Sequence, residues 1–569
     1  MLTLQLKLTD NQVSVSANGK ESHQFPLLDL SQSKDDWRTF LDNPRPYGKK
    51  LFHALFKDTA RTEFDTLSRQ AERTIVLVLE SSELDGITWE YAFHDGAYVV
   101  EDFAFIRALP ESERPANGRL RSSVERLPLL FIPANPLVDL NGEPMPELDI
   151  ESEWRKLKQF IEESSAPFDL IELRPATPSA LQSLMARFQN GMIAHFSGHG
   201  GTAKDGAFLL FENENGSSNP LNAQEFVREI KDQAWIGFLS ACQSAVEERT
   251  AYGNLARELV KAGVPFALGM QFNLPDPFAP NISGQFYNYL SQGHAVPEAA
   301  RQARRAVKRE HEFYVGMIAL YAAQPTEAGK MSWTGSGART LSIFTEADVN
   351  DLPTPGEFVG RKRELMEIGT SLLRKKKPNT LTLHGAGGIG KTALLWQTLL
   401  RFAPSFESAL AIALDPLPPA LESVLGRLER FLNLPSPSSN QAQEREQIVC
   451  KILTGRQTLL GLDNFETLIH ARDNGSDDEK KTARSLYAFF KNLAAKGVTL
   501  CVTSREKTNL PGETIQEIHG LEDEIGGRLF QNAVNTRRDA LNKTGSEKIS
   551  AAVGGHPLAL RLLAPIFEE

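Results

Sequence analysis

The chain has 569 residues, of which 41% are hydrophobic and 24% are charged, and its formal net charge is −10. One hydrophobic core rarely serves more than about 250–300 residues, so this length predicts several domains. No stretch approaches the roughly 18 consecutive apolar residues of a membrane helix, and the first residues lack the pattern of a signal peptide. The acidic balance argues against general nucleic-acid binding. We therefore expect a multidomain cytoplasmic protein that contacts neither a membrane nor nucleic acid directly.

Residues 1–325 begin with an alternating strand pattern, MLTLQLKLTDNQVSVS, and continue as apolar runs separated by amphipathic segments. From residue 74 to residue 272 the apolar runs are TIVLVLES, PLLFIPANP, FDLIELRP, GMIAHFSGHG, GAFLLFEN, WIGFLSACQS and VPFALGMQF. Helices are expected over 151–164, 178–189, 251–262 and 294–310. This alternation predicts an α/β sheet domain.

A change of composition separates this region from a second one. Residues 326–355 are rich in Gly, Ser, Thr and Pro and have little periodicity, so they predict an interdomain linker. Over 356–569, strands are expected in TLTLHG, SALAIALD, QTLLGLDN and VTLCVTSR, with helices between them. This layout predicts a parallel-sheet P-loop NTPase domain, which ends in a helical subdomain from about residue 510.

The run GAGGIGKT, from Gly385 to Thr392, fits the phosphate-loop pattern GxxxxGK[ST] and lies between a predicted strand and a predicted helix. The glycines of the loop allow backbone amides to surround phosphates, and they are Gly385, Gly387, Gly388 and Gly390. Lys391 can contact the β and γ phosphates, and Thr392 can bind Mg²⁺. The loop therefore predicts ATP or ADP binding with Mg²⁺.

A carboxylate for the same magnesium ion is expected at Asp463, where the apolar run of TLLGLDNFE ends. The next residue is Asn464 and not a second acid, so the group that would polarise an attacking water is missing there. Glu466 could replace it or could be a plain solvated carboxylate. This pattern predicts slow ATP hydrolysis.

Five segments in order resemble the NB-ARC domain and related STAND ATPases: FVGRKREL, the phosphate loop, LLGLDNFE, CVTSRE and GGHPLAL. The resemblance implies a nucleotide switch in which Gly360 and Arg361 lie beside the adenine. It also implies that Arg505 senses the terminal phosphate and that Pro557 packs on the base. Members of this family normally continue into a winged-helix unit and a repeat array that detects a trigger ligand. Because no such sensor region is present, we expect a truncated chain or, less favoured, a sensor on another polypeptide.

Two predicted strands of the first region end in residues that can perform covalent chemistry. HFSGHG contains His199, LSACQS contains Cys242, and the carboxyl ends of strands in an α/β sheet are where sites form. A thiolate is a nucleophile, and an imidazole beside it can stabilise it and then protonate the leaving amine. The backbone amides of Gly200 and Cys242 could form an oxyanion hole. The alternative for Cys242 is a buried structural thiol, the commonest state of that residue.

His195 lies four residues before His199, a spacing that also occurs in helical zinc sites. The zinc pattern HExxH requires a glutamate after the first histidine, whereas Phe196 follows here, and Gly198 disfavours a helix. His195 is therefore interpreted as a structural residue of the strand. Three cysteines occur far apart, and Cys450 and Cys501 are expected to be thiols like Cys242.

The segments HFSGHG and LSACQSA, with ELVKAGVPFALGMQF after them, resemble the CHAT peptidases of the caspase and separase clan. The resemblance covers residues 1–325, with an N-terminal part over 1–120 and a catalytic core over 121–325. It implies that His199 is the general base or acid and Cys242 the nucleophile. Relatives that cut after basic residues have an acid where Ser240 stands, so the cleavage preference is open. Asp205 and Asp276 are other acidic candidates.

Together the two resemblances predict a cysteine protease switched by ATP or ADP, of a bacterial NLR-like defence or cell-death system. A C-terminal sensor outside the chain would detect a trigger, the protein would assemble into a homo-oligomer, and the protease would cleave a partner such as a gasdermin-like effector. The alternative is a non-proteolytic scaffold whose nucleotide domain controls oligomerisation. A transcription regulator is disfavoured because no basic helix-turn-helix candidate is evident.

Overall fold

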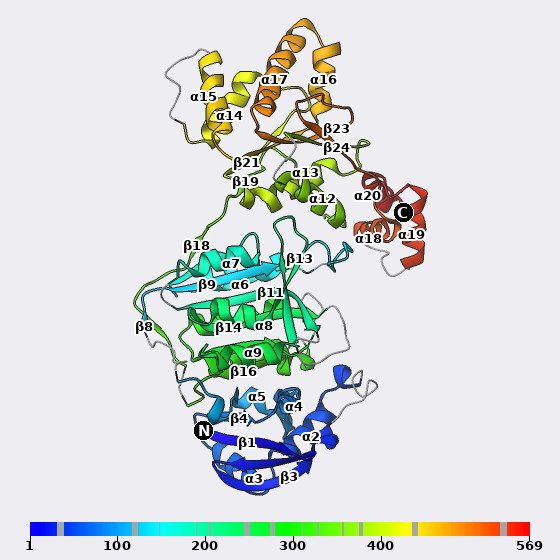
Figure 1. The fold of residues 1–569 in the computed structure, drawn as a ribbon. Helices are drawn as coiled ribbons and strands as arrows, with labels where there is room; N and C mark the ends of the chain where they lie inside the picture. Colours follow the sequence, from blue (N-terminus) through cyan, green and yellow to red (C-terminus); the bar gives the residue numbers. More distant parts are fainter. Residues whose placement is uncertain are drawn as a thin grey trace. The chain divides into compact units, whose positions relative to one another are not determined.

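The structure is a computed structural model in which two compact units make up the chain (Figure 1). The residues described are 1–569 without 31–38, 117–122, 147, 149, 165, 189–190, 204–205, 244–250, 273–278, 310, 327–328, 356–357, 375–378, 435–441, 535–542 and 569. Unit 1 comprises Met1–Pro136, Pro146–Glu212 and Ser218–Ile343. Unit 2 comprises Leu137–Met145, Asn213–Ser217 and Phe344–Glu569.

Unit 1 is built on one sheet of 14 strands, in the order β18-β10-β9-β11-β14-β15-β16-β7-β4-β1-β2-β3, with β12 and β13 extending from β11. The strands are β1 (Leu2–Thr9), β2 (Gln12–Ala17), β3 (Lys20–Pro26), β4 (Thr74–Leu79), β7 (Ala104–Ala108), β9 (Leu127–Ala134), β10 (Phe168–Glu172), β11 (Met192–Ala203), β12 (Gly206–Glu212), β13 (Ser218–Asn222), β14 (Ala234–Gln243), β15 (Phe266–Met270), β16 (Ile318–Ala322) and β18 (Arg339–Leu341). The run from β10 to β15 is parallel, because helices connect its members. All seven apolar runs predicted as strands are present.

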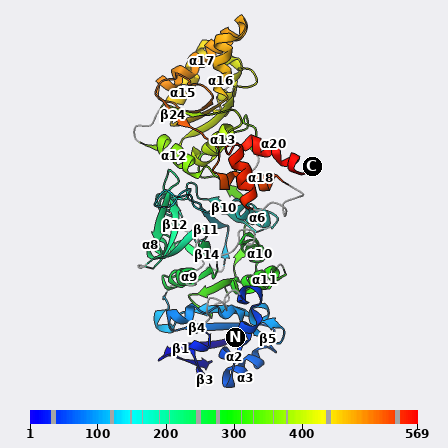
Figure 2. The ribbon, with the colours of Figure 1, turned by 90° about the vertical axis from the view of Figure 1, so that its right-hand side faces the viewer.

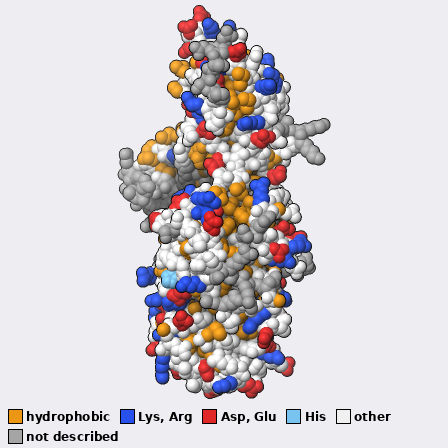
Figure 3. Space-filling view, turned by 90° about the vertical axis from the view of Figure 1, so that its left-hand side faces the viewer, with side chains coloured by type: hydrophobic (Ala, Val, Ile, Leu, Met, Phe, Trp, Pro, Cys, Tyr) orange, Lys and Arg blue, Asp and Glu red, His pale blue; other side chains and the backbone are white. Residues whose placement is uncertain are grey.

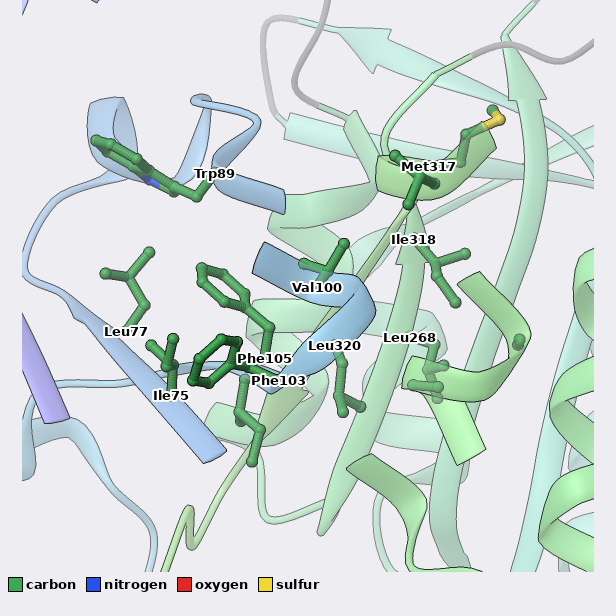
Figure 4. Packing of buried hydrophobic residues seen from close by; sticks show 14 of the residues in the cluster. Ile75, Leu77, Trp89, Val100, Phe103, Phe105, Leu268, Met317, Ile318 and Leu320 are labelled. Atoms are coloured by element: carbon green, nitrogen blue, oxygen red, sulfur yellow. The ribbon is translucent and has the colours of Figure 1, made fainter. Parts of the chain in front are cut away.

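Helices cover both faces of this sheet. They are α2 (Arg45–Leu55), α3 (Asp58–Leu67), α4 (Ser82–Asp85), α5 (Val99–Asp102), α6 (Ile150–Glu162), α7 (Pro178–Met185), α8 (Ala223–Ile230), α9 (Ala251–Lys261), α10 (Ala279–Ser291) and α11 (Val296–Lys308). Figure 2 shows α8 and α9 on one side of β11 and β14, and α6 and α10 on the other. The face with α6 and α10 belongs to a hydrophobic core that continues to β4 and β7, where Ile75, Leu77 and Phe105 pack (Figure 4).

The segment predicted as a linker contains three short strands. β17 (Ser332–Trp333) pairs with β8 (Ser123–Val124), β18 adds to the edge of β10, and β19 (Ala347–Asp348) adds to the sheet of unit 2. The ion pair of Arg339 with Asp169, at 2.7 Å, holds β18 in place. Strands of two or three residues are too short to produce a periodic pattern, so they were not predicted.

Unit 2 contains a six-stranded parallel sheet in the order β19-β21-β22-β23-β20-β24. The further strands are β20 (Thr380–His384), β21 (Ser408–Ala413), β22 (Thr458–Asp463), β23 (Thr499–Ser504) and β24 (Glu513–Glu517). The helices are α12 (Lys362–Leu373), α13 (Lys391–Phe402), α14 (Leu421–Phe431), α15 (Ala442–Thr454), α16 (Phe465–Asn474), α17 (Asp477–Ala495), α18 (Asp523–Ala533), α19 (Lys543–Ala552) and α20 (Pro557–Glu568). A helical C-terminus after a parallel sheet confirms the predicted fold class. The helices of this part begin at Asp523, after β24.

Within the described residues, no helix is both long and apolar enough to span a membrane. Acidic and basic side chains are interspersed over the described part of the face in Figure 3.

Candidate active site and nucleotide site

The two predicted catalytic residues occupy one register position of neighbouring strands. β11 and β14 run parallel, and His199 pairs with Cys242 in that ladder. Adjacent strands lie about 4.8 Å apart, so the backbones of these two residues are direct neighbours. Both positions lie near the carboxyl ends of their strands. The side chain of Cys242 lies outside the described part of the structure, as do Asp205 and Asp276.

The ring of His199 is buried, with 1% of the residue exposed. Its Nε2 lies 3.2 Å from the carbonyl oxygen of Pro146. A carbonyl only accepts hydrogen bonds, so this contact requires the proton on Nε2. In the neutral ring Nδ1 is then the acceptor, which is the form that a general base needs.

Close packing of neighbouring strands accounts for the glycines around His199. A Cβ at Gly198 would lie 2.5 Å from the carbonyl oxygen of Ala134 at the end of β9, and one at Gly201 would lie 2.8 Å from the ring of Phe208. At position 198 the close atom belongs to the backbone of β9, so glycine is required there whatever space a substrate needs. At position 201 a larger residue would require the ring of Phe208 to move.

His195 lies within β11 and is fully buried. Its Nδ1 lies 3.2 Å from the hydroxyl of Tyr287, and its Nε2 lies 3.3 Å from the carboxylate of Glu153. These contacts tie the strand to α10 and α6. They agree with the interpretation of His195 as a residue of the scaffold.

Glu153 is a residue near the site that sequence reasoning missed. It is only 2% exposed, and its carboxylate accepts hydrogen bonds from the hydroxyls of Ser197, Ser240 and Ser283. Burial alone would raise its pKa, but the neighbouring His195 ring and these hydroxyls outweigh burial, so the pKa of Glu153 lies below its usual value. A signal was present, because Glu153 shares the buried stripe of α6 with apolar residues at helical spacing.

The two remaining cysteines are buried free thiols in unit 2. Burial raises the pKa of Cys501 to about 12 and also raises the pKa of Cys450. At neutral pH both thiols are held protonated, which makes them poor nucleophiles. Cys242 is therefore the cysteine whose position suits covalent chemistry.

In unit 2 the phosphate loop connects β20 to α13, as predicted. Gly388 and Gly390 have φ angles of 74° and 98°, a region that favours glycine. The ammonium of Lys391 donates to the carbonyls of Gly385 and Ala386, both at 2.9 Å. Burial lowers the pKa of Lys391. The helix N-terminus and this ammonium together form a site suited to phosphate.

Asp463 lies at the end of β22, within hydrogen-bond distance of the loop. Thr392 donates to its Oδ1 at 2.9 Å, and Thr503 of β23 donates to the same oxygen at 2.6 Å. Burial raises the pKa of Asp463, and the two hydroxyls only partly offset this. A hydroxyl and a carboxylate are oxygen donors of the kind that Mg²⁺ prefers, so Thr392 and Asp463 fit the predicted ion. Thr503 was not predicted.

Arg505 follows β23 and lies beside the phosphate loop. A Cβ at Gly387 would be 2.8 Å from the guanidinium carbon of Arg505. The Nε of Arg505 pairs with the carboxylate of Glu466 at 3.1 Å. Both charged groups predicted from the sequence thus lie near the loop, and they contact one another.

Arg361 and Pro557 also lie beside the loop. Arg361, which follows Gly360, donates to the carbonyl of Ile389 at 3.0 Å. From the GGHPLAL segment, Pro557 lies 4.0 Å from a Cβ placed on Gly390. His556 was not predicted, yet its Nε2 donates to the carbonyl of Gly387 at 2.9 Å. The four other segments therefore all have a residue beside the phosphate loop.

Fold and site define an α/β protein that carries a candidate Cys–His pair in its first unit and a P-loop NTPase fold in its second. A model of the CHAT domain family matches residues 45–335, more than half of the chain. The chain therefore belongs to the CHAT domain family. A search of curated proteins found no match.

Several solved structures are similar over part of the chain. The STAND protein with a tetratricopeptide repeat sensor from Pyrococcus horikoshii is 20% identical over 38% of this chain and 31% of that one, with a TM-score of 0.27. Cdc6p from Pyrobaculum aerophilum is 16% identical over 38% of this chain and 62% of that one, with a TM-score of 0.27. The Saccharomyces cerevisiae separase–securin complex is 14% identical over 47% of this chain and 16% of that chain, with a TM-score of 0.28. The chain spans less than two thirds of each of these proteins.

Proposed function

We propose that the protein is a cysteine peptidase in which His199 and Cys242 form the catalytic pair. The observation that carries this proposal is their direct pairing in the ladder of β11 and β14. The Cys242 thiolate would attack the carbonyl carbon of a peptide bond, and the imidazolium of His199 would give its proton to the leaving amine. The backbone amides of Gly200 and Cys242 would donate to the oxyanion. Water, deprotonated by His199, would then release the acyl group.

Unit 2 would act as a nucleotide switch that controls this peptidase. The phosphate loop would hold ATP or ADP. Thr392 and Asp463 would hold Mg²⁺, which would neutralise charge on the phosphates. Gly360, Arg361 and Pro557 would surround the base, and Arg505 would contact the terminal phosphate. Asn464 follows Asp463, so hydrolysis would be slow, and Glu466 is the available base once Arg505 leaves it.

A covalent connection supports control of one unit by the other. Leu137 and Val138 belong to a hydrophobic core of unit 2, together with residues of α12 and α13. The same segment ends at Met145, whose carbonyl accepts a hydrogen bond from Lys362. The next residue is Pro146, the partner of His199. A nucleotide-dependent shift of α12 would therefore be transmitted to His199 through the Lys362–Met145 hydrogen bond, the Met145–Pro146 peptide bond and the Pro146–His199 hydrogen bond.

In the cell, we infer a cytoplasmic protease of a bacterial NLR-like system. A sensor region outside this sequence would bind a trigger ligand, the activated protein would form a homo-oligomer, and the peptidase would cut a partner protein in defence or cell death. A gasdermin-like effector is one such partner. These roles rest on the association of a CHAT domain with a P-loop NTPase fold.

The test is peptide cleavage by the chain in ATP and Mg²⁺, measured with a fluorogenic peptide library. Cys242→Ala and His199→Ala are expected to abolish cleavage, whereas Cys450→Ala, which alters a buried thiol of unit 2, is expected to retain it. Cleavage that persists in Cys242→Ala would overturn the assignment. Nucleotide-dependent self-association without any cleavage would support the scaffold instead.

A further inference from the structure

The carboxylate of Glu153, on α6, connects this helix with β11, β14 and α10 near the candidate catalytic pair. Its Oε2 accepts from Ser197 of β11 at 2.7 Å and from Ser240 of β14 at 3.2 Å. Its Oε1 accepts from Ser283 of α10 at 2.8 Å and faces His195 at 3.3 Å. One side chain from α6 thus joins both catalytic strands to the helix that covers them.

The two serines on these strands have matching positions. Ser197 lies two residues before His199, and Ser240 lies two residues before Cys242. Residues two apart on a strand belong to the same face, so both serines occupy the face of the catalytic positions. They also form a register pair, like His199 and Cys242. Glu153 Oε2 therefore links β11 to β14 two residues before the catalytic positions.

Burying a charge at this point costs free energy, so the carboxylate requires an explanation. Taking a carboxylate out of water carries a desolvation penalty, and apolar residues of similar volume often stabilise a fold equally well or better. Apart from the polar side chains that contact the carboxylate, the core on this face consists mainly of apolar residues, among them Phe131, Phe238 and Leu157. The carboxylate is thus an exception within a core that hydrophobic packing already supports.

We propose that Glu153 is a positioning residue for catalysis, which holds the ends of β11 and β14 at the spacing that His199 and Cys242 require. This inference rests on the proposed peptidase function. The ladder of β11 and β14 continues only one residue pair beyond His199 and Cys242, to Gly200 and Gln243. The shared oxygen of Glu153 adds a side-chain link between the same two strands, two residues before the catalytic pair. Misplacement of reacting groups by about 1 Å is sufficient to lower a rate about 10²-fold.

The experiment compares two serine variants in the full chain with ATP and Mg²⁺. Ser240→Ala removes the bridge to β14 but leaves Glu153 its other donors. Ser291→Ala is the matched control, because Ser291 is also buried and lies on α10, but its hydroxyl donates to the backbone of Asn288. We measure kcat and KM, with the active fraction counted by an irreversible peptide reagent.

Ser240→Ala is expected to lower kcat per active molecule about tenfold, close to the lower limit for one hydrogen bond to a charged group, while KM changes less than about twofold. Glu153→Gln keeps one acceptor oxygen and is expected to retain more activity than Glu153→Ala. Ser291→Ala is expected to keep the kcat of the wild type. A normal kcat in Ser240→Ala, or a change confined to KM, would overturn the positioning role. If the wild type cleaves nothing, the proposed peptidase function fails instead, and the two failures are distinct.

Discussion

Replacing Lys391 with alanine removes the ammonium that the structure places inside the phosphate loop. Its two hydrogen bonds go to the carbonyls of Gly385 and Ala386 in the same loop. In the absence of nucleotide, the substitution therefore removes only these two hydrogen bonds within the loop. A bound phosphate would lose a charge-assisted hydrogen bond, which contributes about 1.5–3 kcal/mol. That range corresponds to an ATP affinity about 10- to 150-fold weaker.

Thermal unfolding with and without ATP and Mg²⁺ measures this loss. At a ligand concentration of 100 Kd, binding stabilises the folded state by about 2.7 kcal/mol. For a unit of this size that is a rise in Tm of about 5–10 °C. A variant with affinity about 100-fold weaker would gain only about 0.4 kcal/mol at the same concentration, or about 1 °C.

The matched control is Lys451→Ala, which removes an exposed lysine from α15 of the same unit. It is expected to show the shift of the wild type. Without nucleotide, Lys391→Ala is expected to unfold close to the wild-type temperature. An equal nucleotide-induced shift in Lys391→Ala and in the wild type would refute the role given to this residue.

Two further predictions concern packing and pH. Gly198→Ala would place a Cβ 2.5 Å from the carbonyl oxygen of Ala134, so we expect a loss of stability of about 1–3 kcal/mol in urea unfolding; an unchanged midpoint would contradict the packing. Burial raises the pKa of Cys501 to about 12, whereas an unfolded thiol titrates near 8.5. Above pH 8.5 only the unfolded thiol ionises, so this thiol should lower the free energy of unfolding by about 1.4 kcal/mol per pH unit. Cys501→Ala should show a flatter pH dependence between pH 8.5 and 10, and identical slopes would contradict this reasoning.

Much of the fold was predictable because the sheet interiors are continuous apolar runs. TLTLH and TLLGLD are buried along nearly their whole length, and such runs indicate parallel strands between helices. β24 was missed because its sequence, ETIQE, is polar and only half buried. The edge strands β18 and β19 were missed because they are too short for any period.

The positions of candidate site residues were predictable where strand ends carry reactive side chains, as at His199 and Cys242. The hydrogen-bond network of Glu153 was not predictable, because its partners come from β11, β14 and α10. The helical pattern of α6 shows that Glu153 is on the buried face but not which residues it meets there. The contacts of His556 and Thr503 likewise depend on segments far apart in the chain. Hydrogen-bond partners across such distances are set by tertiary packing and not by local sequence.

The most direct test of the central claim is labelling by an irreversible electrophilic peptide, with the modified residue identified by mass spectrometry. In the wild type with ATP and Mg²⁺, the label is expected on Cys242, and not on Cys450 or Cys501, whose thiols are held protonated. His199→Ala is expected to slow this labelling strongly, because the thiolate loses its base. Labelling of Cys242 at the same rate in His199→Ala, or no labelling of Cys242 at all, would contradict the assignment of a Cys–His pair.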